Sequence, residues 1–320
     1  MARAEHILVV GGGLIGAGWA AAFAGAGLRA TVLDPDGAAV HRTAAAFDAA
    51  QEVMRALGQW HDDAQRPEIA ATWDDVARAI TFVQESLPED LAVKQAALID
   101  IEARIGDEIV VASSSSGLKP SILQAQMRRP ERLVVGHPCN PPYLMPTVEV
   151  CGGTATATAA IERAADLYAT IGKTVLRLAS EVEGHLVNRL QFALWREMVH
   201  LAETGAASLA DLERAVSIGL APRWLRTGPS MVCHLAGGGG GMDRFLSTLG
   251  PAVEGWWATL GTPRLSEKTG KTIAAQMSAL SQGLNQDALS RRRDETTVAA
   301  LKLQKSWLEA ESAATSIKGR

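Results

Sequence analysis

The fold of this 320-residue chain is decided by a stretch near its N-terminus, which reads Ile7-Leu8-Val9-Val10-Gly11-Gly12-Gly13-Leu14-Ile15-Gly16. Its first four residues are continuously apolar, as expected of a strand that is buried on both faces of a sheet. A helical pattern follows over Leu14–Ala26, so the glycines form the turn between strand and helix. The stretch therefore predicts the first unit of a parallel sheet that is covered by helices.

In this context the G-x-G-x-x-G spacing indicates a dinucleotide-binding turn. Gly11 permits the tight turn, Gly13 lets the backbone approach a pyrophosphate, and Gly16 allows the helix to pack closely on the strand. The free N–H groups of Leu14 and Ile15 then point at the phosphates, aided by the positive end of the helix dipole. We therefore predict that these five residues bind the cofactor.

Asp34 ends the second predicted strand, 18 residues after Gly16. A carboxylate at this position accepts hydrogen bonds from the ribose hydroxyls of NAD and repels the 2′-phosphate of NADP. Pro35 and Asp36 follow it, so the sequence predicts no neighbouring Arg or Lys that could compensate. The predicted cofactor is NAD, with Asp34 as a binding residue.

Short apolar runs alternate with helical patterns through the first half of the chain. This alternation predicts an α/β fold with a Rossmann doubly wound parallel sheet. After about Glu183 the strands stop and the pattern becomes helical, with the glycine run Gly237–Gly241 expected to form a loop. The predicted domains are residues 1–184 and an all-helical C-terminal domain of residues 185–320. The predicted strands are Ile7–Val10, Ala30–Leu33, Ile80–Val83, Ile109–Ala112, Leu133–Val135, Thr147–Val150 and Thr174–Leu178.

Composition excludes several classes of function. The formal net charge is −4 and no basic stripe is present, so nucleic acid is not expected, because phosphate binding needs clustered Lys and Arg. Cys139, Cys151 and Cys233 lack metal-ligand spacing, so no metal is expected. The first strand begins without a leader, and no apolar run reaches the roughly 18 residues of a membrane helix. The sequence thus predicts a cytoplasmic protein without a membrane partner.

His137 follows the predicted strand Leu133–Val135 and Gly136. The carboxyl ends of parallel strands are where open α/β sheets bind ligands. Removal of hydride from an alcohol also requires a base that titrates near neutral pH, which an imidazole provides. The position alone leaves two interpretations open, a general base and a structural histidine.

Four strings carry a resemblance to a known family: Gly136-His137-Pro138-Cys139-Asn140-Pro141-Pro142, Thr147-Val148-Glu149-Val150, Ala112-Ser113-Ser114-Ser115-Ser116-Gly117-Leu118 and Val187-Asn188-Arg189-Leu190. They resemble the signatures of the 3-hydroxyacyl-CoA dehydrogenase family. The resemblance implies that His137 is the general base and that Glu149 orients it. It also implies that Ser116 and Asn188 hold the substrate oxygen. A carboxylate partner fits this role, since it fixes the tautomer of the base and stabilises the imidazolium.

The resemblance also implies cofactor contacts and architecture. Glu89 and Lys94 match family residues at the nicotinamide end of NAD, and Asn140 falls on another cofactor-contacting position. The similarity runs through almost the whole chain and implies an NAD-binding domain followed by a helical substrate domain that pairs into a homodimer. Cys139 departs from the family, which usually has an aromatic or aliphatic residue there. The alternatives for Cys139 are a repacked pocket and a nucleophilic thiol.

Within the family, the chain is most similar to the branch that contains L-gulonate 3-dehydrogenase (lambda-crystallin). This likeness implies oxidation of the 3-hydroxyl group of a small L-3-hydroxy acid, L-gulonate-like, to its 3-oxo acid. The segment Ala50–Asp63, where CoA-binding members use Ser and Lys, has Arg55 as its one permanent cation, which favours a free acid over a CoA ester. Arg223 is a candidate anchor for the carboxylate; an ion pair within or between subunits is its other interpretation.

Two alternatives to this function remain open at the level of sequence. One is a 3-hydroxyacyl-CoA or carnitine dehydrogenase, which parallel assays of the substrates would separate. The other is a crystallin-like structural protein. The combination of His137, Glu149, Ser116 and Asn188 argues against the second alternative, because a purely structural role does not need it.

Overall fold

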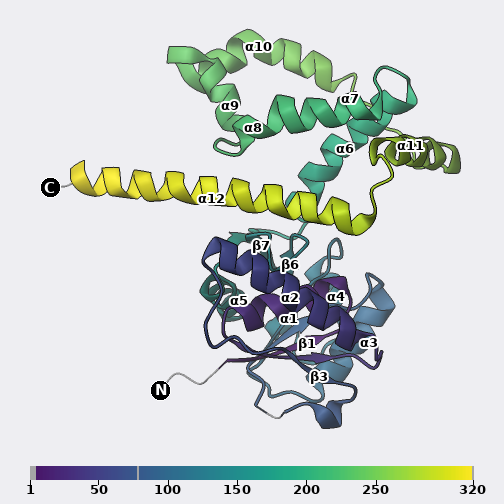
Figure 1. Cartoon of the computed structure of the whole chain (residues 1–320), viewed down its shortest axis with the longest axis vertical. Helices are drawn as coiled ribbons and strands as arrows, with labels where there is room; N and C mark the ends of the chain where they lie inside the picture. Colours follow the sequence, from purple (N-terminus) through teal and green to yellow (C-terminus); the bar gives the residue numbers. More distant parts are fainter. Residues whose placement is uncertain (1–4, 78, 319–320) are drawn as a thin grey trace. The chain divides into compact units, whose positions relative to one another are not determined.

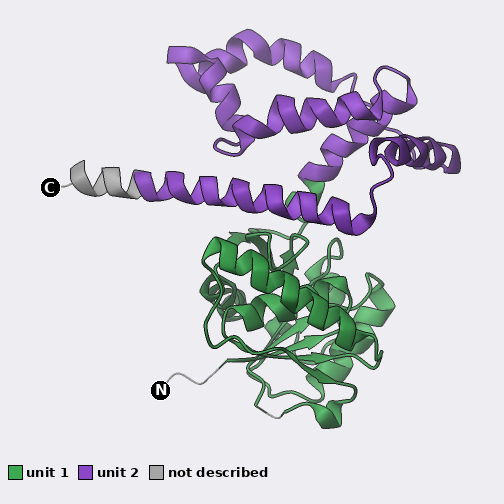
Figure 2. Ribbon diagram, viewed as in Figure 1, with its two compact units in different colours: residues 1–189 green, residues 190–320 purple. Residues whose placement is uncertain are grey.

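The computed structural model describes residues 5–77 and 79–318. The chain forms two compact units, Met1–Arg189 and Leu190–Arg320 (Figure 2). The boundary lies within helix α6 (Val187–Glu203), a few residues beyond the sequence-based boundary at residue 184.

The first unit is built around one eight-stranded sheet with the order β3-β2-β1-β4-β5-β6-β7-β8. Neighbouring strands from β3 to β6 are parallel, whereas β7 is antiparallel to β6 and parallel to β8. Strands are added on opposite sides of β1, so a crevice is expected at the carboxyl ends of β1 and β4. The strands are β1 (His6–Val10), β2 (Arg29–Leu33), β3 (Glu68–Ala70), β4 (Phe82–Glu85), β5 (Val110–Ser113), β6 (Leu133–Pro138), β7 (Thr147–Gly152) and β8 (Thr174–Arg177).

Most strand ends differ from the sequence-based prediction by one or two residues, and three differences matter most. β4 begins at Phe82 rather than Ile80. β3 was not predicted, because a three-residue edge strand carries no apolar run long enough to recognise. β6 continues to Pro138 instead of ending at Val135, since β7 pairs with it over this extension. His137 therefore lies inside a strand rather than after one.

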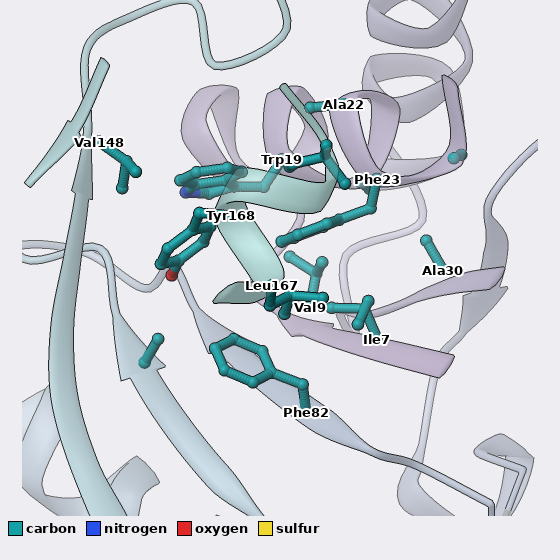
Figure 3. Close-up of a cluster of buried hydrophobic side chains, with 14 of the residues drawn as sticks. Ile7, Val9, Trp19, Ala22, Phe23, Ala30, Phe82, Val148, Leu167 and Tyr168 are labelled. Carbon is teal, nitrogen blue, oxygen red and sulfur yellow. The ribbon is translucent and has the colours of Figure 1, made fainter. Parts of the chain in front are cut away.

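Helices cover both faces of this sheet (Figure 1). Helices α1 (Leu14–Gly25), α2 (Ala39–Leu57) and α5 (Thr158–Thr170) pack on one face, and α3 (Leu91–Glu102) and α4 (Pro120–Leu123) pack on the other. On the first face, Trp19 stacks on Phe23 and Tyr168 with ring centroids 5.2 and 5.1 Å apart (Figure 3). A Cβ atom on Gly136 would lie 2.0 Å from the Tyr168 hydroxyl. The glycine before His137 thus lets α5 pack directly on β6.

The described part of the second unit is helical. It contains the rest of α6, α7 (Leu209–Arg214), a π-helical turn (Ala215–Leu220), α8 (Ala221–Trp224), α9 (Pro229–Ala236), α10 (Gly241–Trp257), α11 (Glu267–Leu280) and α12 (Gln286–Lys318). The glycine run that was expected to be a loop forms a single 3₁₀ turn, Gly238–Gly240, between α9 and α10. Of the helices described, none combines the length and apolarity needed to cross a membrane.

Candidate active site

The glycine-rich turn connects β1 to α1 and touches the residue that follows β4. Gly11 has a φ of +97°, and a Cβ atom there would lie 2.8 Å from the carbonyl oxygen of Ser86. A Cβ atom on Gly16 would lie 1.8 Å from the carbonyl oxygen of Gly11. Gly13 has no atom within 4 Å of its Cβ position. Packing therefore requires glycine at positions 11 and 16, whereas Gly13 leaves space for a ligand to approach the backbone.

The start of α1 offers unused backbone donors. Gly13 is the N-cap residue, and its helix has no side-chain cap. Leu14 in the first turn is 70% exposed. The first N–H groups of a helix lack internal partners and lie at the positive end of its dipole, so they bind phosphate. That the N–H groups of Leu14 and Ile15 hold the pyrophosphate of NAD stays a prediction.

Asp34 follows β2 and turns toward the glycine-rich turn. Its Oδ2 atom accepts the N–H of Gly12 at 2.6 Å, and its Oδ1 atom accepts the N–H of Asp36 at 2.8 Å. The expectation that no cation lies nearby is wrong, because Arg42 places a guanidinium nitrogen 3.9 Å from Asp34. Arg42 also pairs with Asp36 at 2.9 Å and donates to the Gly12 carbonyl oxygen at 2.8 Å. The sequence did not reveal this contact because helix α2 brings Arg42 back over the turn.

His137 and Glu149 are register partners in the antiparallel pair β6–β7. The His137 Nδ1 atom lies 2.8 Å from Glu149 Oε2, and both side chains are buried. The other carboxylate oxygen, Oε1, accepts the N–H of Leu186 at 2.6 Å and of Val187 at 3.0 Å, where α6 begins. Glu149 therefore joins the histidine ring to the start of α6.

The protonation state of Glu149 follows from these contacts. Burial acts to raise the pKa of Glu149, but the hydrogen bonds from His137 and from the N–H groups of Val187 and Leu186 outweigh burial and hold it below its usual range. An ionised Glu149 accepts Nδ1–H from His137 and leaves Nε2 free to take up a proton. The pair thus has the arrangement of a general base with an orienting carboxylate.

Ser116 and Asn188, the two residues expected to hold the substrate oxygen, are in contact. Asn188 in the first turn of α6 donates an Nδ2–H to the carbonyl oxygen of Ser116 at 3.0 Å. The N–H of Gly184 also donates to the carbonyl oxygen of Gly117 at 3.3 Å. These bonds tie the turn after β5 to the segment that Glu149 holds, so one network contains all four predicted catalytic residues.

Glu89 and Lys94 occupy different environments. Glu89 Oε1 accepts the hydroxyl of Ser115 at 2.6 Å and the N–H groups of Ser116 and Gly117, each at 2.9 Å. Burial acts to raise the pKa of Glu89, but the Ser115 hydrogen bond and the charge of Lys94 lower it overall. Glu89 is thus an ionised carboxylate that holds the turn carrying Ser116.

Lys94 is 1% exposed, and its ammonium group is directed into the protein. It donates to both oxygens of buried Glu85, at 2.8 and 3.1 Å, and to the carbonyl oxygen of Leu87 at 3.0 Å. These contacts fix the loop after β4. A direct contact of Lys94 with NAD remains a prediction.

His185 is a site residue that the sequence reasoning missed. It is 0% exposed, its ring centroid lies 5.2 Å from that of His137, and its Nε2 atom lies 3.0 Å from the carbonyl oxygen of Ser115. Burial lowers the pKa of His185, although its contact with the Ser115 carbonyl oxygen acts in the opposite direction. The signal in the sequence was a Gly-His pair whose histidine lies three residues before Asn188. In the structure, Gly184 and His185 both have positive φ.

Asn140 is exposed at the head of the loop between β6 and β7, and its contact with NAD stays a prediction. Its neighbour Cys139 is half-buried. Burial and the charge of Glu149 raise the pKa of the Cys139 thiol, which disfavours the thiolate that a nucleophile needs. Among the described residues, no cluster of His, Cys, Asp and Glu is arranged to hold a metal ion.

Two family models match this chain along most of its length. The NAD binding domain of 3-hydroxyacyl-CoA dehydrogenase matches residues 6–182, and the C-terminal domain of the same family matches residues 184–276. The chain belongs to the 3-hydroxyacyl-CoA dehydrogenase family. It is therefore an NAD-dependent dehydrogenase that acts on a CH–OH group.

The similar curated proteins are named L-carnitine dehydrogenases. The protein from Streptomyces griseus subsp. griseus is 38% identical over 93% of this chain and 89% of its own length. Those from Pseudomonas putida and Bacillus cereus are 37% and 36% identical, over 93% and 95% of this chain and 93% and 94% of their own lengths. These relatives favour the carnitine alternative over the L-gulonate-like substrate that was our first prediction. They do not show that the chain belongs to the gulonate branch of the family.

Two solved structures resemble this fold. The NAD⁺-dependent dismutase 5-formyl-3-hydroxy-2-methylpyridine 4-carboxylic acid 5-dehydrogenase has a TM-score of 0.81 and 28% identity, covering 95% of this chain and 99% of the other. The (S)-3-hydroxybutyryl-CoA dehydrogenase of Ralstonia eutropha has a TM-score of 0.63 and 23% identity, covering 85% and 94%. The second similarity shows the fold alone.

Proposed function

We propose that this dehydrogenase uses NAD to oxidise the 3-hydroxyl group of a small free L-3-hydroxy acid of the carnitine type. The observation that carries the proposal is the buried His137–Glu149 pair, with a 2.8 Å contact between Nδ1 and Oε2. A base oriented in this way serves alcohol oxidation, and the family supplies the nicotinamide that accepts the hydride.

The residues of this chain would divide the work as follows. His137 Nε2 takes the proton of the 3-hydroxyl group as the carbonyl forms, and Glu149 stabilises the resulting imidazolium. Ser116 and Asn188 donate hydrogen bonds to the substrate oxygen. The glycine turn binds the pyrophosphate, Asp34 accepts the ribose hydroxyls, and Glu89, Lys94 and Asn140 surround the nicotinamide end.

A free acid fits the surface of α2 better than a CoA ester does. Arg55 is the one permanent cation of the segment Ala50–Asp63, and its guanidinium stacks over the Trp60 ring, 5.8 Å from the centroid. It is thus already engaged and would have to leave this ring to neutralise a CoA phosphate.

A carnitine-type substrate adds a quaternary ammonium group, which proteins bind on the faces of aromatic rings. Arg223 of α8, an exposed residue of the second unit, remains our candidate for the substrate carboxylate.

We further propose that the protein is a cytoplasmic homodimer that pairs through the helical unit. The described second unit exposes large apolar side chains, with Trp256, Trp257 and Ile218 at 61%, 64% and 73%. Exposed apolar side chains of this size are typical of subunit interfaces.

The experiment that tests the function is an NADH-absorbance assay of the purified protein with a panel of substrates. L-carnitine, 3-hydroxybutyrate and L-gulonate are oxidised with NAD, and acetoacetyl-CoA is reduced with NADH. We expect the highest kcat/KM for L-carnitine or a close analogue. Turnover of acetoacetyl-CoA alone would contradict the free-acid proposal, and preference for L-gulonate would contradict the carnitine-type substrate.

A further inference from the structure

Lys173 lies in the turn between α5 and β8 and holds the loop of residues 139–146, which follows the base. Its ammonium group donates hydrogen bonds to the carbonyl oxygens of Pro142 and, at 2.9 Å, of Met145. No carboxylate of the described chain forms an ion pair with it. A cation that is desolvated without a counter-charge is costly, and burial lowers the pKa of Lys173 to about 8.

Other contacts also hold this loop, because Leu144 is 2% exposed and Tyr143 packs against the apolar core. The N–H groups of Leu144 and Met145 donate to the Pro141 carbonyl oxygen at 3.0 and 2.9 Å, which closes a turn within the loop. The N–H of Thr174 donates to the Pro146 carbonyl oxygen at 2.7 Å. Lys173 and Thr174 therefore bind three carbonyl oxygens of the loop, and the Lys173 side chain binds two of them.

The same loop touches the cofactor helix. A Cβ atom on Gly18 of α1 would lie 2.6 Å from Pro142 Cδ, so Pro142 packs on α1 two residues beyond Gly16, the last residue of the glycine-rich sequence. The loop also begins two residues after His137 and carries Asn140 at its exposed head. A displacement of the loop would therefore act both on the helix that binds the pyrophosphate and on the strand that carries the base.

We propose that Lys173 is a positioning residue for this dehydrogenase, which aligns the loop of residues 139–146 with both the NAD site and His137. It acts through backbone carbonyl groups and does not touch the substrate. The effect on kcat rests on the proposed function, but the effect on cofactor binding does not, because NADH binding needs no substrate.

The test compares Lys173→Met with Arg132→Met in the full-length protein. Arg132 is the control, because it is 4% exposed and donates to the carbonyl oxygens of Gly106 at 2.6 Å and Glu102 at 3.2 Å. It directly precedes β6, so it lies at the end of that strand opposite to His137. Both variants lose a cation bonded to carbonyl groups. The Kd for NADH is measured by fluorescence titration, kcat with the best substrate, and the thermal midpoint by circular dichroism.

We expect Lys173→Met to raise the Kd for NADH and to lower kcat by about tenfold or more, because small displacements of catalytic groups have effects of this size. Arg132→Met should lower the thermal midpoint but change both constants by less than about twofold. Lys173→Arg, which keeps the donors, should recover most of the NADH affinity. If Lys173→Met does not fold, Lys173→Gln replaces it. Equal constants for the Lys173 and Arg132 variants would overturn the proposal and leave Lys173 with a structural role.

Discussion

The two units of this protein differ in how completely they bury their apolar side chains. The first unit has two apolar cores, one on each face of its sheet, and the strands β1 and β6 are buried along their whole length. The described core of the second unit consists of Met198, Ala202, Leu209 and Leu212, while Trp256 and Trp257 are more than half exposed. The first unit therefore has the core of a self-sufficient domain, whereas the second leaves large apolar side chains exposed.

This difference bears on where we place the candidate catalytic residues and the proposed dimer surface. The base, its carboxylate and the cofactor turn lie in the first unit, where burial and hydrogen bonds on several sides fix each side chain. Precise placement of catalytic groups requires such support. The second unit contributes exposed residues, among them Arg223 and the α10 tryptophans, which are suited to binding a substrate or a second subunit.

The largest effect is expected for His137→Ala in the first unit. Loss of the base should lower kcat by about 10²- to 10⁴-fold, whereas the Kd for NADH should stay within a few-fold because the glycine turn is untouched. Steady-state kinetics and fluorescence titration measure the two quantities. His6→Ala is the control, since His6 is also buried but lies at the start of β1. Near-normal turnover in His137→Ala would refute the role of the base.

The second prediction concerns the exposed surface of the helical unit. Trp257→Glu should weaken the homodimer by about 30-fold or more, as expected for removal of a central aromatic residue from an interface. Sedimentation velocity over a range of concentrations would show a shift to monomer. Ile99→Glu on α3, an equally drastic change at a 38% exposed site of the first unit, should leave the association unchanged. A wild-type protein that is monomeric at all concentrations would disprove this division of roles.

Asp34→Ala should change the cofactor preference. The variant loses the acceptor for the ribose hydroxyls, so NAD should bind about tenfold or more weakly. It also frees Arg42, whose guanidinium now lies 3.9 Å from Asp34, to meet the 2′-phosphate of NADP. The measured quantity is the ratio of kcat/KM for the two cofactors, with Arg42→Ala in the same background as control. An unchanged ratio would contradict the ribose contact.

The smallest effect is expected for the pH dependence of stability. Because the pKa of Glu149 is held below its ordinary value in the folded state, its contribution to stability is complete above the unfolded-state pKa and is lost as the pH falls through the folded-state pKa. Glu149→Gln should therefore cost about 1–3 kcal/mol at pH 7 and less at pH 4. Urea unfolding across this range measures it, with the exposed Glu267→Gln as control. A pH-independent difference would argue against an ionised Glu149.

The sequence predicted most strands of the sheet. Strands buried on both faces are continuously apolar, so β1, β2, β5 and β6 could be recognised directly. The edge strand β3 was missed, because it has only three residues. The end of β6 could not be predicted, since its last residues pair with a strand that lies about ten residues further along the chain.

The candidate site shows the same limit. The glycine turn, Asp34 and the sequence strings around His137 and Asn188 could be recognised because their chemistry depends on local spacing. Arg42, Lys173 and His185 were missed because their neighbours come from other segments. His185, for example, contacts Ser115 and His137, which lie 70 and 48 residues earlier in the chain.

The sequence by itself determined the strand–turn–helix unit, the family resemblance, the identity of the cofactor and the residue types of the base and its carboxylate. These features are set by composition and spacing within short segments. Only the tertiary structure decided that His137 and Glu149 are register partners, that Arg42 stands beside Asp34 and that Lys173 holds the loop after the base. Hydrogen bonds and desolvation depend on which distant segments meet, and the packing of the whole unit determines that.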